Sequence, residues 1–246
     1  RPSSDTAPLP SFAACAIGCT LPAGAGRGAR AMHDREASIA ADWRGRVPGA
    51  LLVLFAVAWL ALGYAPRYRQ DWLLENVLVL VAIPVLVWTH RRMPLGNGLC
   101  LGLFVFGLLH EVGAHYTYSE VPYDAWLTSL LGWSPNEAFG FGRNHYDRLI
   151  HLAYGLLVTP VAMHLIEARA RPTGAWRWLL PVAFISSHSA LYELIEGAAA
   201  AVFGGELGMA YLGTQGDVWD AHHDMALAMA GSAISASWLL WRRRVA

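Results

Sequence analysis

Six long runs of apolar residues, separated by short polar stretches, occupy most of the chain. A helix needs about 20 apolar residues to cross the hydrocarbon core of a bilayer, and the runs have about this length or more. They cover residues 47–64, 72–90, 95–118, 146–167, 176–203 and 218–241. Because backbone polar groups in lipid must be paired within the segment, each run is predicted to be helical. The pattern therefore predicts an all-α, polytopic membrane protein with six transmembrane helices in a bundle.

The composition agrees with this class and excludes others. Of the 246 residues, 55% are hydrophobic and only 15% are charged, whereas a soluble domain carries about 25% charged residues. The formal net charge is zero, so nothing favours binding to nucleic acid. The expected partner is the lipid bilayer itself, and the oligomeric state cannot be read from the sequence.

Residues 1–46 differ from the rest of the chain. They are rich in Ala, Gly and Pro, show no helical period, and do not begin with methionine. We interpret them as a disordered or non-native leader, with the native start near Met32. The membrane domain then covers residues 47–241, and residues 242–246 form a basic tail.

The arginines predict the orientation of the spans. Positively charged residues are enriched in cytoplasmic loops, and one side of the predicted bundle carries 11 of the 18 basic residues, all of them arginine. These are Arg35, Arg44, Arg46, Arg91, Arg92, Arg169, Arg171, Arg177, Arg242, Arg243 and Arg244. The other side has Arg67, Arg69 and Arg143, with Arg148 at a span boundary. Both termini are therefore predicted to be cytoplasmic.

Polar residues gather at one end of the last four spans. They are His110, Glu111, His115, Tyr116, Tyr118, Asn144, Asp147, Arg148, His151, His188, Glu193, Glu196, Asp217, Asp220, His222, His223 and Asp224. Because successive spans alternate in direction, all of these positions face the extracytoplasmic side. Each ionised group at the bilayer centre costs about 2.5–3.5 kcal/mol on insertion scales. This convergence indicates a binding or catalytic cleft that opens to the outer leaflet.

The residue types suggest roles within this cleft. We expect catalytic groups at His115, Asp147, Arg148 and His151, with a histidine as general base and Arg148 on an anionic oxygen. Further cleft residues are predicted at His110, Glu111, Tyr118, Asn144, His188 and Gln215. A divalent cation is expected on Glu193, Glu196, Asp217, Asp220 and Asp224. Oxygen ligands suit Mg²⁺, Mn²⁺ or Ca²⁺, and an added histidine suits Zn²⁺.

Four strings, in this order, carry a resemblance to a known family. They are GAHYTY at residues 113–118 with VPY at 121–123, RNHYDRLIH at 143–151, LYELIE at 191–196, and GTQGDVWD at 213–220 with DM at 224–225. The chain resembles the YjdF type of bacterial inner-membrane protein, a family of unknown function. The resemblance implies location in the bacterial inner membrane and a topology, but no reaction. More distantly, the last three spans are similar to VanZ-like proteins associated with glycopeptide resistance, which suggests lipid or antibiotic handling in the cell envelope.

Three classes of function remain open. The first is a site for a lipid or envelope-precursor head group, either a binding site or the active site of a metal-dependent membrane hydrolase or transferase. The second is a proton- or ion-coupled transporter, although transporters commonly contain internal repeats and none is evident here. The third is a structural or partner-binding membrane protein whose polar network only orients helices.

Overall fold

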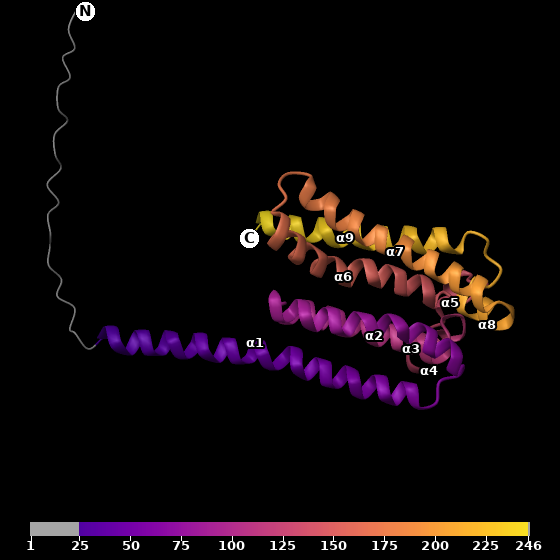
Figure 1. Cartoon of the computed structure of the whole chain (residues 1–246), viewed down its shortest axis with the longest axis horizontal. Coiled ribbons are helices and arrows are strands. Elements are labelled where there is room, and N and C mark those ends of the chain that lie inside the picture. Colours follow the sequence, from indigo (N-terminus) through magenta and orange to yellow (C-terminus); the bar gives the residue numbers. More distant parts are fainter. Residues whose placement is uncertain (1–24, 246) are drawn as a thin grey trace, which may run out of the picture. The chain divides into compact units, whose positions relative to one another are not determined.

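The chain folds into helices joined by short loops (Figure 1). The computed structural model describes residues 25–245, with side chains from Gly45 onward apart from Glu206, Leu207 and Ala210, and this part contains no strand. The long helices are α1 (Ala25–Tyr64), α2 (Arg69–Arg92), α3 (Asn97–Tyr116), α6 (Tyr146–Ala170), α7 (Trp176–Phe203) and α9 (Asp220–Val245). The short elements are η1 (Tyr118–Glu120), α4 (Tyr123–Leu131), α5 (Pro135–Phe139) and α8 (Gly205–Leu212). The all-α prediction is confirmed.

Five helices within residues 25–245 are long and apolar enough to cross a membrane. They are α2, α3, α6, α7 and the Gly45–Tyr64 part of α1. The sixth long helix, α9, has 26 residues, but it begins with acidic residues and ends with three arginines, which lower its hydropathy. It is packed mainly against α6 and α7, so it needs less lipid-facing apolar surface than the others. The protein is therefore a polytopic, all-α membrane protein with five apolar spans and one more polar long helix.

The two ends of the chain differ in part from the expected boundaries. The prediction of a leader falls partly on residues 1–24, which lie outside the described residues, and it stays a prediction. Helix α1 already begins at Ala25, upstream of the expected start at residue 47, because alanine and arginine favour helix without any apolar period. Helix α9 continues through the arginines to Val245. Residues 1–43 and 44–246 form separate units, and everything described below lies in the second.

Helices α6 and α9 touch backbone to backbone. A Cβ atom added to Gly155 would lie 2.6 Å from the backbone nitrogen of Ser232, and one added to Gly231 would lie 2.5 Å from the carbonyl oxygen of Leu152. One turn along, the Thr159 hydroxyl donates a hydrogen bond of 2.7 Å to the Ser232 hydroxyl in the buried interface. Small residues permit such close approach between membrane helices. This contact fixes the register of the two helices that carry most of the candidate site.

The short elements lie together at one end of the bundle. Figure 1 shows α4, α5 and α8 near the end of α3 and the starts of α6 and α9. The polar residues singled out in the sequence also belong to this end. The opposite halves of α3, α6 and α7 have charged residues only in the last turn of α6 and the first turn of α7, so the candidate site is one-sided.

Candidate functional site

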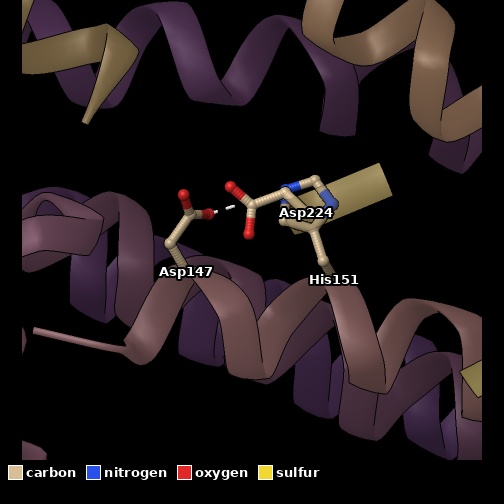
Figure 2. A group of neighbouring side chains, drawn as sticks. All are labelled: Asp147, His151 and Asp224. Carbon is tan, nitrogen blue, oxygen red and sulfur yellow. Dashed lines mark ion pairs between the residues drawn. The ribbon is translucent and has the colours of Figure 1, made fainter. Parts of the chain in front are cut away.

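One histidine and three carboxylates meet where α6, α7 and α9 pack together. Asp147 and His151 lie one turn apart on α6, and ligand atoms of both lie within 4.8 Å of each other and of Asp224 on α9. The His151 Nε2 atom is 3.4 Å from Glu193 Oε1 on α7 and 3.6 Å from Asp147 Oδ1. Figure 2 shows Asp147 and His151 rising from α6 toward Asp224. We call these four residues the inner group.

The inner group is buried and lacks a basic partner apart from its histidine. Asp224 is only 2% exposed, and His151 is 7% exposed. Glu193 Oε1 and Asp224 Oδ1 are buried atoms with no hydrogen-bond partner among the described residues. Within the same part of the chain, no arginine forms an ion pair with Asp147, Glu193 or Asp224. Buried carboxylates are normally paired or bound to a metal, so this group has the properties of a cation site.

A second cluster lies one helical turn nearer the loops. Arg143 Nη1 is 2.7 Å from Asp220 Oδ1, and the Arg148 guanidinium forms an ion pair with the Asp217 carboxylate. The His223 Nδ1 atom lies 3.0 Å from Asp217 Oδ2. We call these five residues the outer group. Its two carboxylates are matched by two guanidinium groups.

Local contacts keep the outer group charged as expected at neutral pH. The backbone N–H of Trp219 donates a 2.9 Å hydrogen bond to Asp217 Oδ1 and, together with His223 and Arg148, lowers the pKa of Asp217. The pKa of His145, just before α6, is lowered by burial and by the nearby Arg148 and Arg143. Asp217 is thus a carboxylate and His145 is neutral at pH 7. The outer group is an electrostatically complete unit.

Asn144 and Gln215 connect the loops that precede α6 and α9. The Asn144 N–H donates to Gln215 Oε1 at 2.9 Å, and the Gln215 side-chain amide donates to the Asn144 carbonyl at 3.0 Å. The Asn144 side chain also accepts a hydrogen bond of 2.9 Å from the N–H of Tyr146 at the start of α6. This pair positions the two helices that bear the inner group.

Helix α2 contributes polar residues that the sequence analysis missed. Asp71, Glu75 and Asn76 are each no more than 3% exposed. Glu75 Oε2 accepts a hydrogen bond of 3.2 Å from the Tyr192 hydroxyl on α7, and Asp71 accepts one from the Thr117 hydroxyl. The sequence contains a signal for them, because Asp71 and Glu75 are two acids four residues apart at the start of an apolar run. Placing them in a membrane costs as much free energy as placing the acids of the later spans.

Helix α3 and the end of α7 place further predicted residues near this polar layer. The Tyr118 hydroxyl is hydrogen bonded to His110 Nδ1. Glu111 is fully buried, and neither carboxylate oxygen has a hydrogen-bond partner among the described residues. Glu196 lies close enough to Asp147, Glu193 and Glu75 to be repelled by all three carboxylates. Polar groups therefore extend from the inner group toward α2.

Two of the histidines singled out in the sequence lie elsewhere. His115 Nδ1 is 2.7 Å from the carbonyl oxygen of Leu62. His188 is exposed, and its ring contacts Phe184 on its own helix. At 100° per residue, His188 is about 140° away from Glu193 around α7, so the two residues cannot share a face. The structure does not bring His115 or His188 to the inner group.

The structure also divides the expected cation ligands. Glu193 and Asp224 belong to the inner group and Glu196 lies beside it, whereas Asp217 and Asp220 pair with arginines. Arg143 was counted in the sequence only as a loop residue, yet it is the partner of Asp220. A sequence pattern of acidic residues does not reveal which of them meet an arginine.

Comparisons with known proteins agree with this architecture. Residues 47–245 match the family described as predicted membrane protein (DUF2238). The chain is also 33% identical over 178 residues to the inner membrane protein YjdF of Escherichia coli (strain K12). The aligned region covers 72% of this chain and 81% of that protein. No solved structure matches the chain.

These matches assign a family but not a reaction. They confirm the YjdF resemblance seen in the four sequence strings, whereas the more distant similarity to VanZ-like proteins stays a prediction. The family match covers five of the six long helices completely, α1 from residue 47 onward, and both groups of polar residues. The chain therefore belongs to the DUF2238 family of predicted membrane proteins, of the YjdF type.

Proposed function

We propose that this protein is a metal-dependent enzyme of the bacterial inner membrane that acts on the polar head group of a lipid or envelope precursor. Asp147, His151 and Asp224 would hold the cation, with Glu193 beside them. The observation that carries the proposal is the meeting of three carboxylates, of which Asp224 is buried and Asp147 and Glu193 are partly buried, around the buried His151 without an arginine partner among the described residues. One imidazole with carboxylate oxygens suits Zn²⁺ or Mn²⁺ better than Mg²⁺ or Ca²⁺.

The charge balance is the physical reason for a cation. Three carboxylates in a low-dielectric site repel one another strongly, and a neutral imidazole does not offset them. The nearest arginines already serve the outer group, where Arg143 binds Asp220 and Arg148 binds Asp217. A divalent ion held by Asp147, His151 and Asp224 would compensate most of the inner charge and would give Asp224 Oδ1, which has no hydrogen-bond partner among the described residues, a partner.

The neighbouring residues support chemistry of the hydrolase or transferase class. A bound divalent ion polarises an ester or phosphoryl oxygen of the head group. Glu193 and Glu196 place two further carboxyl groups beside the ion, where one of them could take up a proton from an attacking water or hydroxyl. Arg148 Nε is buried without a partner among the described residues, so it can donate to an anionic oxygen at the mouth of the site.

The arginine distribution supports an outward orientation of this site. Eleven arginines lie on one side of the predicted bundle, which is therefore predicted to be cytoplasmic. The outer group, α4 and α5 are then on the extracytoplasmic side. Head groups of the outer leaflet would then reach the inner group past the loops before α6 and α9. Labelling of an introduced cysteine at Ser134, between α4 and α5, from the periplasmic side is expected; labelling only from the cytoplasm would reverse the orientation.

Metal content provides the direct test. We expect the full-length protein, purified in detergent without chelator, to retain about one equivalent of zinc or manganese, measured by elemental mass spectrometry. The variants Asp224→Asn and His151→Gln should bind the ion at least tenfold more weakly, because loss of even a supporting group costs about 10–100-fold in metal affinity. The matched control His188→Gln removes an exposed histidine outside the group and should leave binding unchanged.

Other results identify the competing functions. The inner group would be structural if two results are found together. The wild-type protein would bind neither zinc nor manganese in titration, and the Asp224→Asn and Glu193→Gln proteins would fully restore a deletion strain. Proton uptake that depends on Glu193 in proteoliposomes, without any metal, would instead favour a proton-coupled carrier. The enzyme proposal requires metal binding and loss of complementation in the same variants.

A further inference from the structure

An apolar cavity of about 420 Å³ lies between α1, α2, α3 and α6. Its volume is within the range of about 300–1,000 Å³ that is typical of small-molecule sites. Carbon atoms form nearly all of its lining, which includes Phe55 on α1, Leu86 on α2, Phe104 on α3 and Val158 on α6. No part of the cavity belongs to the inner group, and the proposed chemistry does not use it.

The cavity reaches from the interior of the bundle to its lipid-facing surface, where the lining residues Leu52, Leu78 and Val85 are 39%, 44% and 54% exposed. Phe55, Val79 and Leu95 line it, and each is at most 9% exposed. Protein interiors are closely packed, and a void forfeits contacts for every side chain around it. Because its walls are membrane-spanning segments, the apolar molecules available to fill it are lipid chains.

Helix α6 links the cavity to the inner group. The face that presents Asp147 and His151 continues through Tyr154 and Val158, at the spacing of one helical stripe. Tyr154 and Val158 line the cavity. At about 1.5 Å per residue, Tyr154 lies only about 4.5 Å further along the helix axis than His151. The cavity therefore begins about one turn below the candidate cation ligands.

The same end of the cavity carries a buried polar group. His110 lines the cavity and is 4% exposed, and its Nε2 atom has no hydrogen-bond partner among the described residues. Its other ring nitrogen is bound to the Tyr118 hydroxyl, and the Tyr118 ring packs against Tyr146, next to Asp147. The cavity thus has a buried polar group at the end toward the inner group, while His90 lies at its other end and apolar side chains line the length between them.

The dimensions match one hydrocarbon chain. Along α3 the lining extends from Cys100 to His110, which is about 15 Å at the helical rise. This equals half the thickness of a bilayer core about 30 Å thick, in the half that extends from His110 toward the predicted cytoplasmic end. The volume and length together fit a single extended chain that begins near the inner group.

We propose that this cavity holds the hydrocarbon chain of the molecule whose head group binds at the inner group, so that the substrate is a long-chain amphiphile with an anionic head. This inference rests on the proposed function only for the identity of the head-group site. The chain contacts α1, α2, α3 and α6, while the head group lies between α6, α7 and α9. The His110 imidazole contacts the polar atoms that join the head group of the amphiphile to its hydrocarbon chain.

Photochemical mapping tests the position of the chain. The probe is hexadecyl phosphate with a diazirine at the chain end, added to the full-length wild-type protein in lipid nanodiscs. Cross-links are expected on cavity residues such as Leu86, Leu95 and Phe104. Unlabelled hexadecyl phosphate should compete, whereas butyl phosphate at the same concentration should not, because its chain is too short to reach the cavity.

A matched pair of variants separates the cavity from the lipid-facing surface. Ala82 lines the cavity, and its neighbour Val81 is 60% exposed. Ala82→Phe fills the space and should reduce cavity cross-links at least fivefold, whereas Val81→Phe should leave them unchanged. Equal labelling of cavity residues and of exposed residues such as Leu80 in the wild-type protein would overturn the inference.

The Asp224→Asn variant separates this inference from the proposed function. Cavity labelling that persists in this variant supports the chain site, even if no metal binds to the wild-type protein and the head-group proposal fails. Metal binding in the wild-type protein without competable cavity labelling overturns the chain site and leaves the metal proposal standing.

Discussion

The inner and outer groups share helices α6 and α9, yet their charges are balanced in opposite ways. In the outer group, Arg143 and Arg148 match Asp220 and Asp217. One turn deeper, Asp147, Glu193 and Asp224 surround His151 without any arginine among the described residues. The outer group has matched charges, whereas the inner group has no matching arginine among the described residues, which is the basis of the proposed cation site.

A single helical turn separates an aspartate that is paired with arginine from one that is not. Asp220 and Asp224 are four residues apart on one face of α9, so about 6 Å along the axis divides them. Arginine side chains can reach the first position from the loop before α6, but they would have to enter the bundle to reach the second. The comparison shows that depth, not residue type, decides which acid is paired and which is available to a ligand.

The largest expected effect comes from exchanging these two aspartates for asparagine. Asp220→Asn removes the nearer carboxylate of Arg143, which then has only Asp217 at 3.6 Å, and should cost about 3 kcal/mol of stability, as expected when one partner of a buried pair is removed. Asp224→Asn, compared in the presence of chelator, should leave stability unchanged or raise it, because it removes an uncompensated buried charge. Unfolding in mixed micelles measures both.

Metal addition sharpens the same comparison. Zinc or manganese should stabilise the wild-type and Asp220→Asn proteins but not Asp224→Asn, since a ligand that binds only the folded state adds stability. Equal destabilisation of the two variants in chelator, with no response to metal in any protein, would show that both groups are ordinary ion-pair networks.

A smaller effect is expected from the glycine contact that holds the inner group together. Gly155→Ala puts a methyl group against the backbone of α9, which cannot move aside cheaply, and should cost about 1–3 kcal/mol. It should also weaken metal binding at the inner group, because Asp224 moves away from His151. Thermal unfolding and metal titration give the two measurements.

The control for this prediction is a glycine in open space. A Cβ atom at Gly197 on α7 meets nothing within 4 Å, so Gly197→Ala should stabilise the protein by about 0.5–1 kcal/mol through helix propensity. If Gly155→Ala behaves like Gly197→Ala, the close α6–α9 contact does not hold the site.

The smallest effect concerns the pH dependence of the outer group. The pKa of Asp217 is lowered from its ordinary value of 3.8, so the folded state favours its carboxylate form. This contribution is present above pH 3.8 and is lost as the pH falls through the lowered value. The stability difference between wild-type protein and Asp217→Asn should be constant from pH 7 to 5 and shrink in stronger acid.

Salt offers the control for this prediction. Asp217 is accessible to water, so 1 M salt should reduce the difference at pH 7 by screening. A difference that grows on acidification would contradict the lowered pKa.

Most of the fold could be predicted from hydrophobic runs, because lipid imposes helix on any apolar segment of sufficient length. The predicted span at residues 176–203 matches α7. The third span ends earlier than expected, since Thr117 has a positive φ of 66° and its hydroxyl binds Asp71. That bond joins residues 46 positions apart, and no local pattern contains it.

The candidate site was predictable only in part. Helical spacing alone put Asp147 and His151 on one face and linked Asp220 with Asp224, because a period of 3.6 residues fixes such relations. The choice of Arg143 as the partner of Asp220 depends on how two loops meet. Glu75 and Tyr192 lie on helices far apart in sequence, and their contact depends on packing that no single helix encodes.

The contact between Gly155 and Gly231 has a consequence for motion. Two backbones that touch cannot slide or roll without colliding, so α6 and α9 can move only together, as one rigid body with fixed ligand positions. Any opening that admits a chain must then occur at the looser boundary, where side chains of α1 and α2 border the cavity. We expect α1 and α2 to move apart transiently at the cavity while the carboxylates on α6 and α9 keep their spacing. Entry of a hydrocarbon chain would then not disturb the geometry of the ion site.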